Sequence, residues 1–124
     1  MTAPPASTVY VPPINKRDRI PQAAIDNVVR QIAEKFKPIK IILFGSYAYG
    51  TPRRESDVDL LVIMNSSKKE NALSLEIRRA IDYHFGLDLI VKTQKSLTAR
   101  IKLGDFFLKE ILQKGKVMYE RTSC

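Results

Sequence analysis

Apolar residues recur every three or four positions between residues 22 and 36, and mostly polar or charged residues fill the positions between them. This spacing places the apolar side chains on one face of an α-helix. Pro21 can occupy the first turn of that helix, and Pro38 disfavours its continuation. The pattern therefore predicts an amphipathic helix whose apolar face consists of Ile25, Val28, Val29, Ile32 and Phe36.

Three short apolar runs follow a different pattern. Residues 39–44, 58–64 and 87–91 are rich in β-branched and aliphatic side chains. Runs of this length are typical of strands that are buried on both faces of a sheet. We expect these three strands to lie in one sheet, with residues 117–119 as a short edge strand.

Helical patterns separate the strands. Residues 46–48 predict a short helix, and a stripe of apolar residues over 73–85 predicts a longer one with Gly86 as its C-terminal cap. Two further helices are expected, one after a cap at Ser96 and one over residues 106–112. This order of elements predicts an α/β (α+β) fold, in which a single mixed β-sheet is covered by helices.

The length and composition are those of one small domain. We expect residues 1–20 to form a flexible N-terminal tail and residues 21–124 to form the domain. A hydrophobic content of 44% with 27% charged residues is typical of a soluble globular protein. No run reaches the roughly 20 apolar residues of a membrane span. The single cysteine, Cys124, cannot form an internal disulfide, which favours a reducing, cytoplasmic location.

The chain carries a net charge of +8 and has a pI near 9.7. This excess favours anionic partners, which include nucleotide phosphates, RNA and acidic proteins. A basic surface that only contacts solvent would have the same composition, so charge alone leaves both interpretations open.

Two aspartates lie at the start of the second predicted strand. Asp57 and Asp59 are two residues apart, and this spacing points both carboxylates to one face of a strand. Two negative charges at that distance repel each other, and a divalent cation removes the conflict. Mg²⁺ prefers carboxylate oxygens together with water and substrate phosphates, and two such ions can clamp a phosphoryl displacement.

A third carboxylate, Asp88, lies at the start of the next predicted strand. If that strand neighbours the one that begins at Asp57, the three acids can converge. Asp88 would then be placed to bind a metal ion or to accept the proton of an attacking hydroxyl group.

Gly45 and Ser46 lie where the first predicted strand meets the short helix. Glycine allows a phosphate to approach the backbone closely, and the free amides of a helix start favour an anion. The Ser46 hydroxyl can donate a further hydrogen bond to a β- or γ-phosphate. Each of these signals is weak by itself, but together with the aspartates they indicate a site for a nucleotide and metal ions.

Two segments match a family motif. Residues 43–50 read LFGSYAYG, and residues 56–62 read SDVDLLV. With Asp88 in LDLIV and the ending at 111–119, they resemble the minimal nucleotidyltransferase family of the polymerase-β-like superfamily. The resemblance spans roughly residues 22 to 120 and implies the polymerase-β-like nucleotidyltransferase fold.

The resemblance also implies roles for single residues. Gly45 and Ser46 would hold the triphosphate, with Arg53 at a position where the family often carries arginine. Asp57 and Asp59 would bind Mg²⁺, and Asp88 would activate the acceptor hydroxyl as the third acid of the metal site. The reaction implied is transfer of AMP from ATP, with pyrophosphate leaving. Small members of the family often pair with a HEPN-domain ribonuclease toxin and, as its type VII antitoxin, adenylylate one of its tyrosines.

One residue departs from the family pattern, because Tyr49 stands where the family often has an arginine. This difference favours a second hypothesis, a non-catalytic antitoxin that occludes its toxin. A third hypothesis is nucleotidyl transfer to a small molecule or to RNA. We expect Tyr47, Tyr49 and the single histidine, His84, to be packing residues, with His84 half-buried on the apolar stripe of a helix. The adjacent Phe106 and Phe107 cannot both face the core.

Overall fold

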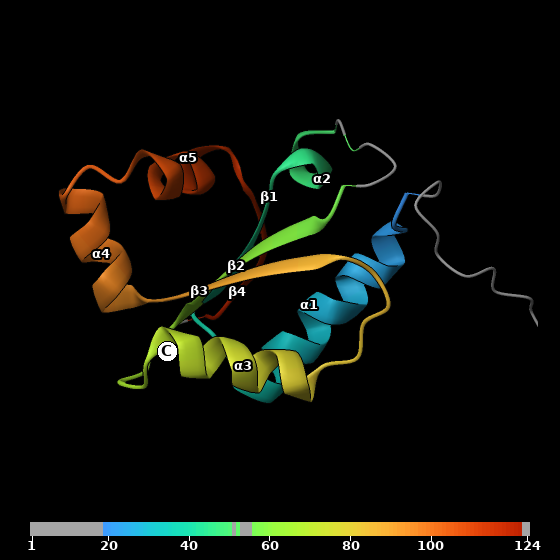
Figure 1. The fold of residues 1–124 in the computed structure, drawn as a ribbon, viewed down its shortest axis with the longest axis horizontal. Coiled ribbons are helices and arrows are strands. Elements are labelled where there is room, and N and C mark those ends of the chain that lie inside the picture. Colours follow the sequence, from blue (N-terminus) through green and yellow to red (C-terminus); the bar gives the residue numbers. More distant parts are fainter. Residues whose placement is uncertain (1–18, 51, 53–55, 123–124) are drawn as a thin grey trace, which may run out of the picture.

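The computed structural model describes residues 19–50, 52 and 56–122, which form one sheet with helices on both of its faces (Figure 1). The elements follow one another in the order α1 (Gln22–Phe36), β1 (Lys40–Phe44), α2 (Ser46–Tyr49), β2 (Val58–Met64), α3 (Glu70–Ala80), β3 (Leu87–Thr93), α4 (Gln94–Lys102), α5 (Phe106–Lys114) and β4 (Lys116–Glu120).

The four strands lie in the order β3-β2-β1-β4. β1 pairs antiparallel with both β2 and β4, whereas β2 and β3 are parallel. The mixed sheet predicted from the sequence is therefore confirmed, and β4 lies at its edge as expected. Parallel pairing of β2 and β3 requires a crossover, which α3 provides.

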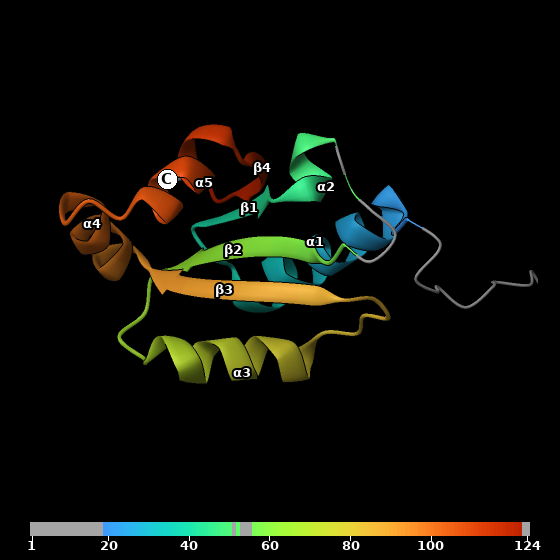
Figure 2. The same cartoon turned by 45° about the horizontal axis from the view of Figure 1, so that its top comes forward.

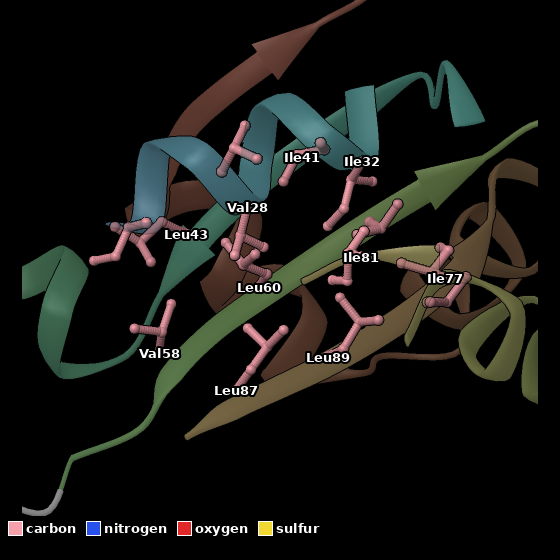
Figure 3. Close-up of a cluster of buried hydrophobic side chains, with 14 of the residues drawn as sticks. Val28, Ile32, Ile41, Leu43, Val58, Leu60, Ile77, Ile81, Leu87 and Leu89 are labelled. Atoms are coloured by element: carbon pink, nitrogen blue, oxygen red, sulfur yellow. The ribbon is translucent and has the colours of Figure 1, made fainter. Parts of the chain in front are cut away.

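The helices α1 and α3 cover one face of the sheet, which we call the α1/α3 face (Figure 2). The larger hydrophobic core lies here, where apolar side chains of both helices meet alternate residues of β1, β2 and β3 (Figure 3). Burial of this apolar surface is the main source of stability of such a fold. Its labelled members in Figure 3 are Val28, Ile32, Ile41, Leu43, Val58, Leu60, Ile77, Ile81, Leu87 and Leu89.

The helices α4 and α5 cover the opposite face, which we call the α4/α5 face (Figure 2). The core on this side is smaller, because it is formed by the remaining alternate residues of β1 and β2 and a few helix residues. Its buried members are Ile42, Phe44, Leu61, Ile63, Leu97, Leu108 and Ile111.

The prediction of a helix over 73–85 is wrong at the C-terminal end, because α3 stops at Ala80. Side chains of α1 make the hydrogen bonds that a further turn of α3 would have made. The Gln31 side chain bonds both the N–H and the carbonyl of Asp82, and the Lys35 ammonium donates to the carbonyl of Ala80. These contacts join residues about 50 positions apart, so they leave no local signal in the sequence.

Two predictions for the segment after α3 are corrected by this early end. Gly86 is not a helix cap but lies in the connection that leads into β3. His84 lies in the same connection and is exposed, so it is not a half-buried residue of a helical stripe. The cap predicted at Ser96 is also displaced, because the Thr93 side chain accepts the hydrogen bond from the backbone N–H of Ser96.

The N-terminal tail expected over residues 1–20 lies almost wholly outside the described residues. Of the two positions that are described, Ile20 is buried in the core of the α1/α3 face, and its N–H donates a 2.9 Å hydrogen bond to the Tyr47 hydroxyl. None of the helices within the described residues has both the length and the apolar character needed to cross a bilayer.

Candidate active site

The strand pairing brings the three sequence-predicted aspartates to one end of the sheet. Phe44, the last residue of β1, is the register partner of Asp59. Asp59 is in turn the register partner of Asp88 on the parallel strand β3. The condition set by the sequence, that the strand of Asp88 neighbours the strand of Asp59, is therefore met.

Alternation along the strands then decides which face carries the carboxylates. Val58 and Leu60 are buried in the core of the α1/α3 face, and so are Leu87 and Leu89. Because successive side chains point to opposite faces of a sheet, Asp57, Asp59 and Asp88 point toward the α4/α5 face. They lie just beyond the point where the small core of that face ends at Phe44.

The Asp59 carboxylate has a raised pKa. Burial, followed by the negative charges of Asp88 and then of Asp57, raises its pKa from 3.8 to about 6. Asp57 and Asp88 are both exposed, whereas Asp59 is half-buried between them and the rest of the protein. Burial and nearby negative charges destabilise the ionised form of the Asp59 carboxylate. Because a bound cation would stabilise that form, Asp59 is a favourable ligand for a cation.

Gly45 makes room for Asp59. A Cβ atom at position 45 would lie 2.1 Å from Oδ2 of Asp59, far inside van der Waals contact. The backbone of Gly45 also has φ +75° and ψ −161°, a region that is essentially restricted to glycine. Two independent constraints therefore require glycine here, and both bring the β1–α2 junction close to the Asp59 carboxylate.

Gly86 makes room for Asp57 in the same way. A Cβ atom at position 86 would lie 2.1 Å from Oδ1 of Asp57, and the carbonyl of Gly86 accepts a 2.9 Å hydrogen bond from the N–H of Val58. Sequence reasoning missed this contact because it assigned Gly86 to the end of a helix. The local signal available was a glycine two residues before Asp88, at the start of a strand that pairs with β2.

The short helix α2 starts beside the carboxylates. The carbonyl of Gly45 accepts the first bonds of the helix from the N–H groups of Ala48 and Tyr49, so those of Ser46 and Tyr47 precede the helical ladder. The hydroxyl of Tyr47 accepts the bond from Ile20, and this residue packs against the core as expected. Tyr49 is 46% exposed, so it does not pack as the sequence suggested.

The chemistry of this donor set fits a divalent cation. Three carboxylates face one end of the sheet, and a positive charge would offset the burial and the repulsion by Asp88 and Asp57 that raise the pKa of Asp59. No group of three or more His, Cys, Asp or Glu side chains in the described part of the chain forms a ready-made metal site. An ion at this position would therefore need additional oxygen ligands, as Mg²⁺ normally takes from water and phosphates. Arg53 lies outside the described residues.

Comparison with known proteins shows the family of the chain. The nucleotidyltransferase domain family matches residues 25–118. Two proteins of Methanocaldococcus jannaschii that are named putative protein adenylyltransferases are similar in sequence. MJ0604 is 29% identical over 100 residues, which cover 79% of this chain and 97% of the relative. MJ1305 is 32% identical over 105 residues, which cover 80% of this chain and 71% of the relative.

Two solved structures share the fold. One is a putative nucleotidyltransferase from Sulfolobus solfataricus, with a TM-score of 0.56 and 20% identity over 80% of this chain and 79% of that one. The other is described as a toxin–antitoxin with AMP-PNP, with a TM-score of 0.51 and 23% identity over 78% of this chain and 74% of that one.

Proposed function

The chain belongs to the nucleotidyltransferase domain family, and we propose that it is a Mg²⁺-dependent enzyme that transfers AMP from ATP to a hydroxyl group of a partner protein. One observation carries this proposal. Asp57 and Asp59 at the start of β2 and Asp88 at the start of β3 point to one face of the sheet, next to the β1–α2 junction at Gly45.

Asp57 and Asp59 are the residues that would hold Mg²⁺, with Asp88 as the third acid of the site. The ion would supply positive charge at the phosphates of ATP. The protein would contribute the fixed positions of the carboxylates, since the pairing of β2 with β3 and the close approach of Gly45 and Gly86 restrict where they can lie.

The β1–α2 junction would bind the triphosphate. The N–H groups of Ser46 and Tyr47 lie ahead of the first hydrogen bond of α2, and the Ser46 hydroxyl can donate to a phosphate oxygen. Gly45 would contribute by letting the Asp59 carboxylate approach this junction, which brings a ligand for Mg²⁺ next to the phosphate-binding N–H groups. Arg53 would add a positive charge to the same phosphates.

In the transfer step, the acceptor hydroxyl oxygen attacks the α-phosphorus of ATP. A new oxygen–phosphorus bond forms, and the bond between the α-phosphorus and the oxygen that bridges to the β-phosphate breaks. Pyrophosphate leaves with the electron pair of that bond. Asp88 is exposed at the site and would accept the proton that the hydroxyl loses.

We further propose that the acceptor is a tyrosine of a HEPN-domain ribonuclease toxin and that this protein is the antitoxin of the pair. The names of the two archaeal relatives and the fold shared with a toxin–antitoxin structure support a protein acceptor.

The test is a transfer assay with labelled ATP, Mg²⁺ and the protein encoded by the neighbouring gene. We expect wild type to label a tyrosine of that protein, as mass spectrometry would locate, and EDTA to abolish the label. A double variant, Asp57→Asn with Asp59→Asn, should lose transfer by roughly 1000-fold or more, equivalent to about 4 kcal/mol of transition-state stabilisation. The matched control, Asp26→Asn with Asp82→Asn, removes two exposed carboxylates elsewhere and should keep full activity. Equal labelling by wild type and the site variant would contradict the proposal.

A non-catalytic antitoxin is the second candidate, and the exposed Tyr49 on α2 favours it because it replaces the arginine common in the family. A rescue assay in cells separates the two functions. If the Asp57→Asn, Asp59→Asn variant still neutralises the toxin, binding alone accounts for neutralisation. If it does not, although it still binds the toxin, neutralisation requires catalysis.

A further inference from the structure

Three large apolar side chains are exposed where α4 turns into α5. Leu103 is 85% exposed, Phe106 81% and Phe107 55%, and we call these three residues the apolar turn. The sequence indicated that only one of the two phenylalanines could face the core, but neither is buried. The core positions of α5 are instead Leu108 and Ile111. The side chains of the apolar turn are therefore not required for packing α5 against the sheet.

The apolar turn approaches the proposed catalytic end of the sheet through one of its members, Phe107. The ring of Phe107 makes an edge-to-face contact with the ring of Phe44, with 5.8 Å between centroids and an interplanar angle of 84°. Phe44 is the register partner of Asp59 and directly precedes Gly45. A protein that covers the apolar turn, including Phe107, would therefore extend toward the proposed carboxylate site.

The surroundings of the apolar turn are positively charged. Residues 94–118 contain six basic and two acidic residues. Both acids are neutralised locally, since Asp105 pairs with Arg100 at 2.9 Å and Glu110 pairs with Lys114 at 3.2 Å. Within the described residues, the other four cations of this segment form no ion pair. These are Lys95, Lys102, Lys109 and Lys116.

We propose that the apolar turn is the docking surface for the acceptor protein and that the docked face of this partner presents an apolar residue surrounded by carboxylates. This inference rests on the proposed transfer to a protein and adds where that protein binds. Aromatic residues, including phenylalanine, are enriched at the centres of protein interfaces, and complementary charge speeds association. A second copy of the chain is disfavoured as occupant, because two surfaces with the same excess of lysines repel each other.

The test measures binding of the protein encoded by the neighbouring gene by titration calorimetry. The double variant Leu103→Ser with Phe106→Ser leaves the Phe107–Phe44 contact in place, and we expect it to raise the Kd by at least tenfold. Leu75→Ser, which removes an exposed leucine on α3, is the matched control and should leave the Kd unchanged. Binding of Mg²⁺–ATP should be the same for all three proteins.

A second variant tests the charge. Lys102→Glu with Lys109→Glu should slow association with the partner, and the association rate of wild type should fall as salt increases.

An unchanged Kd for the Leu103→Ser, Phe106→Ser variant would overturn the docking proposal. So would sedimentation that shows a wild-type dimer and a monomeric variant, because the apolar turn would then bind a second copy.

Two measurements, binding and transfer, distinguish a wrong docking surface from a wrong enzymatic function. The Asp57→Asn, Asp59→Asn variant should bind the partner with the affinity of wild type, although it transfers no AMP. A partner that binds through the apolar turn but is never labelled by wild type would contradict the transfer reaction and leave the docking surface intact. A partner labelled by wild type and equally by the Leu103→Ser, Phe106→Ser variant at low partner concentration would contradict only the docking surface.

Discussion

Seventeen buried apolar residues fill the α1/α3 face of the sheet within the described part of the chain, whereas the α4/α5 face has seven. On the first face, apolar side chains continue along β2 from Val58 to Met64. On the second, the core stops at Phe44, and carboxylates that repel one another occupy the remaining end of the strands. The α1/α3 face therefore contributes most of the stability. The α4/α5 face is less stabilising, because a site that can bind a cation occupies positions that apolar residues would otherwise fill.

The largest effect that can test this comparison comes from two neighbouring leucines of β2. Leu60 and Leu61 are both fully buried, but they point to the α1/α3 face and the α4/α5 face respectively. We expect Leu60→Ala to lower the free energy of unfolding by about 4 kcal/mol and Leu61→Ala by about 2–3 kcal/mol, since fewer buried neighbours surround the second cavity. Urea denaturation measures both values, and equal losses would contradict the comparison.

Gly45→Ala should damage stability and activity together. The new Cβ would collide with Asp59 Oδ2, and the positive φ would cost roughly 1–3 kcal/mol. Because Asp59 must move, transfer should fall by roughly 100-fold or more. Gly50→Ala is the matched control, since Gly50 also has a positive φ of 81° but a Cβ there meets nothing within 4 Å. Gly50→Ala should lose stability and keep its activity. If both variants lost the same activity, backbone strain and not the collision with Asp59 would be the cause.

Gly86→Ala should affect the site with little effect on the fold. Its φ is compatible with alanine, and the atom that the new Cβ meets is the end of the Asp57 side chain, which can rotate away. We expect stability to change by less than about 1 kcal/mol and transfer to fall by roughly tenfold, with a higher Mg²⁺ concentration needed for half-maximal rate. His84→Ala, an exposed change in the same connection, should alter neither. Normal magnesium dependence in Gly86→Ala would show that Asp57 tolerates the displacement.

Asp59→Asn should have a small effect on stability, and its sign is opposite to that of the leucine variants. Between pH 4 and pH 6, native Asp59 retains a proton that the unfolded chain has lost, so the stability of wild type falls as pH rises through this window. Without metal at pH 7.5, the variant should be more stable by about 1 kcal/mol or less, because solvent screens a half-buried carboxylate. Near pH 4 the gain should vanish.

Thermal denaturation in EDTA over this pH range measures the gain, and Glu34→Gln on the exposed side of α1 is the control that should show none. Added Mg²⁺ should stabilise wild type and leave Asp59→Asn nearly unaffected. An Asp59→Asn protein that is less stable than wild type at pH 7.5 would contradict the view that this end of the sheet is under electrostatic strain.

Local patterns in the sequence were sufficient for most of the elements. The apolar stripe of α1 and the aliphatic runs of β1, β2 and β3 depend on neighbours within a few residues, and the structure has them where they were expected. The spacing of Asp57 and Asp59 was likewise enough to place both carboxylates on one face. These features could be predicted because side-chain alternation and helical periodicity are properties of the chain itself.

The remaining features depend on contacts between distant residues. The end of α3 at Ala80 depends on Gln31 and Lys35 of α1, and this end leaves Gly86 free to approach Asp57. The proximity of Asp88 to Asp59 depends on the parallel register of β2 and β3, which the order of elements allows but does not impose. The exposure of the apolar turn depends on which residues of α5 reach the core. The sequence alone thus determined the elements and the candidate ligands. Only the tertiary structure decided which of them meet, because hydrogen bonds and packing between distant segments have no local pattern.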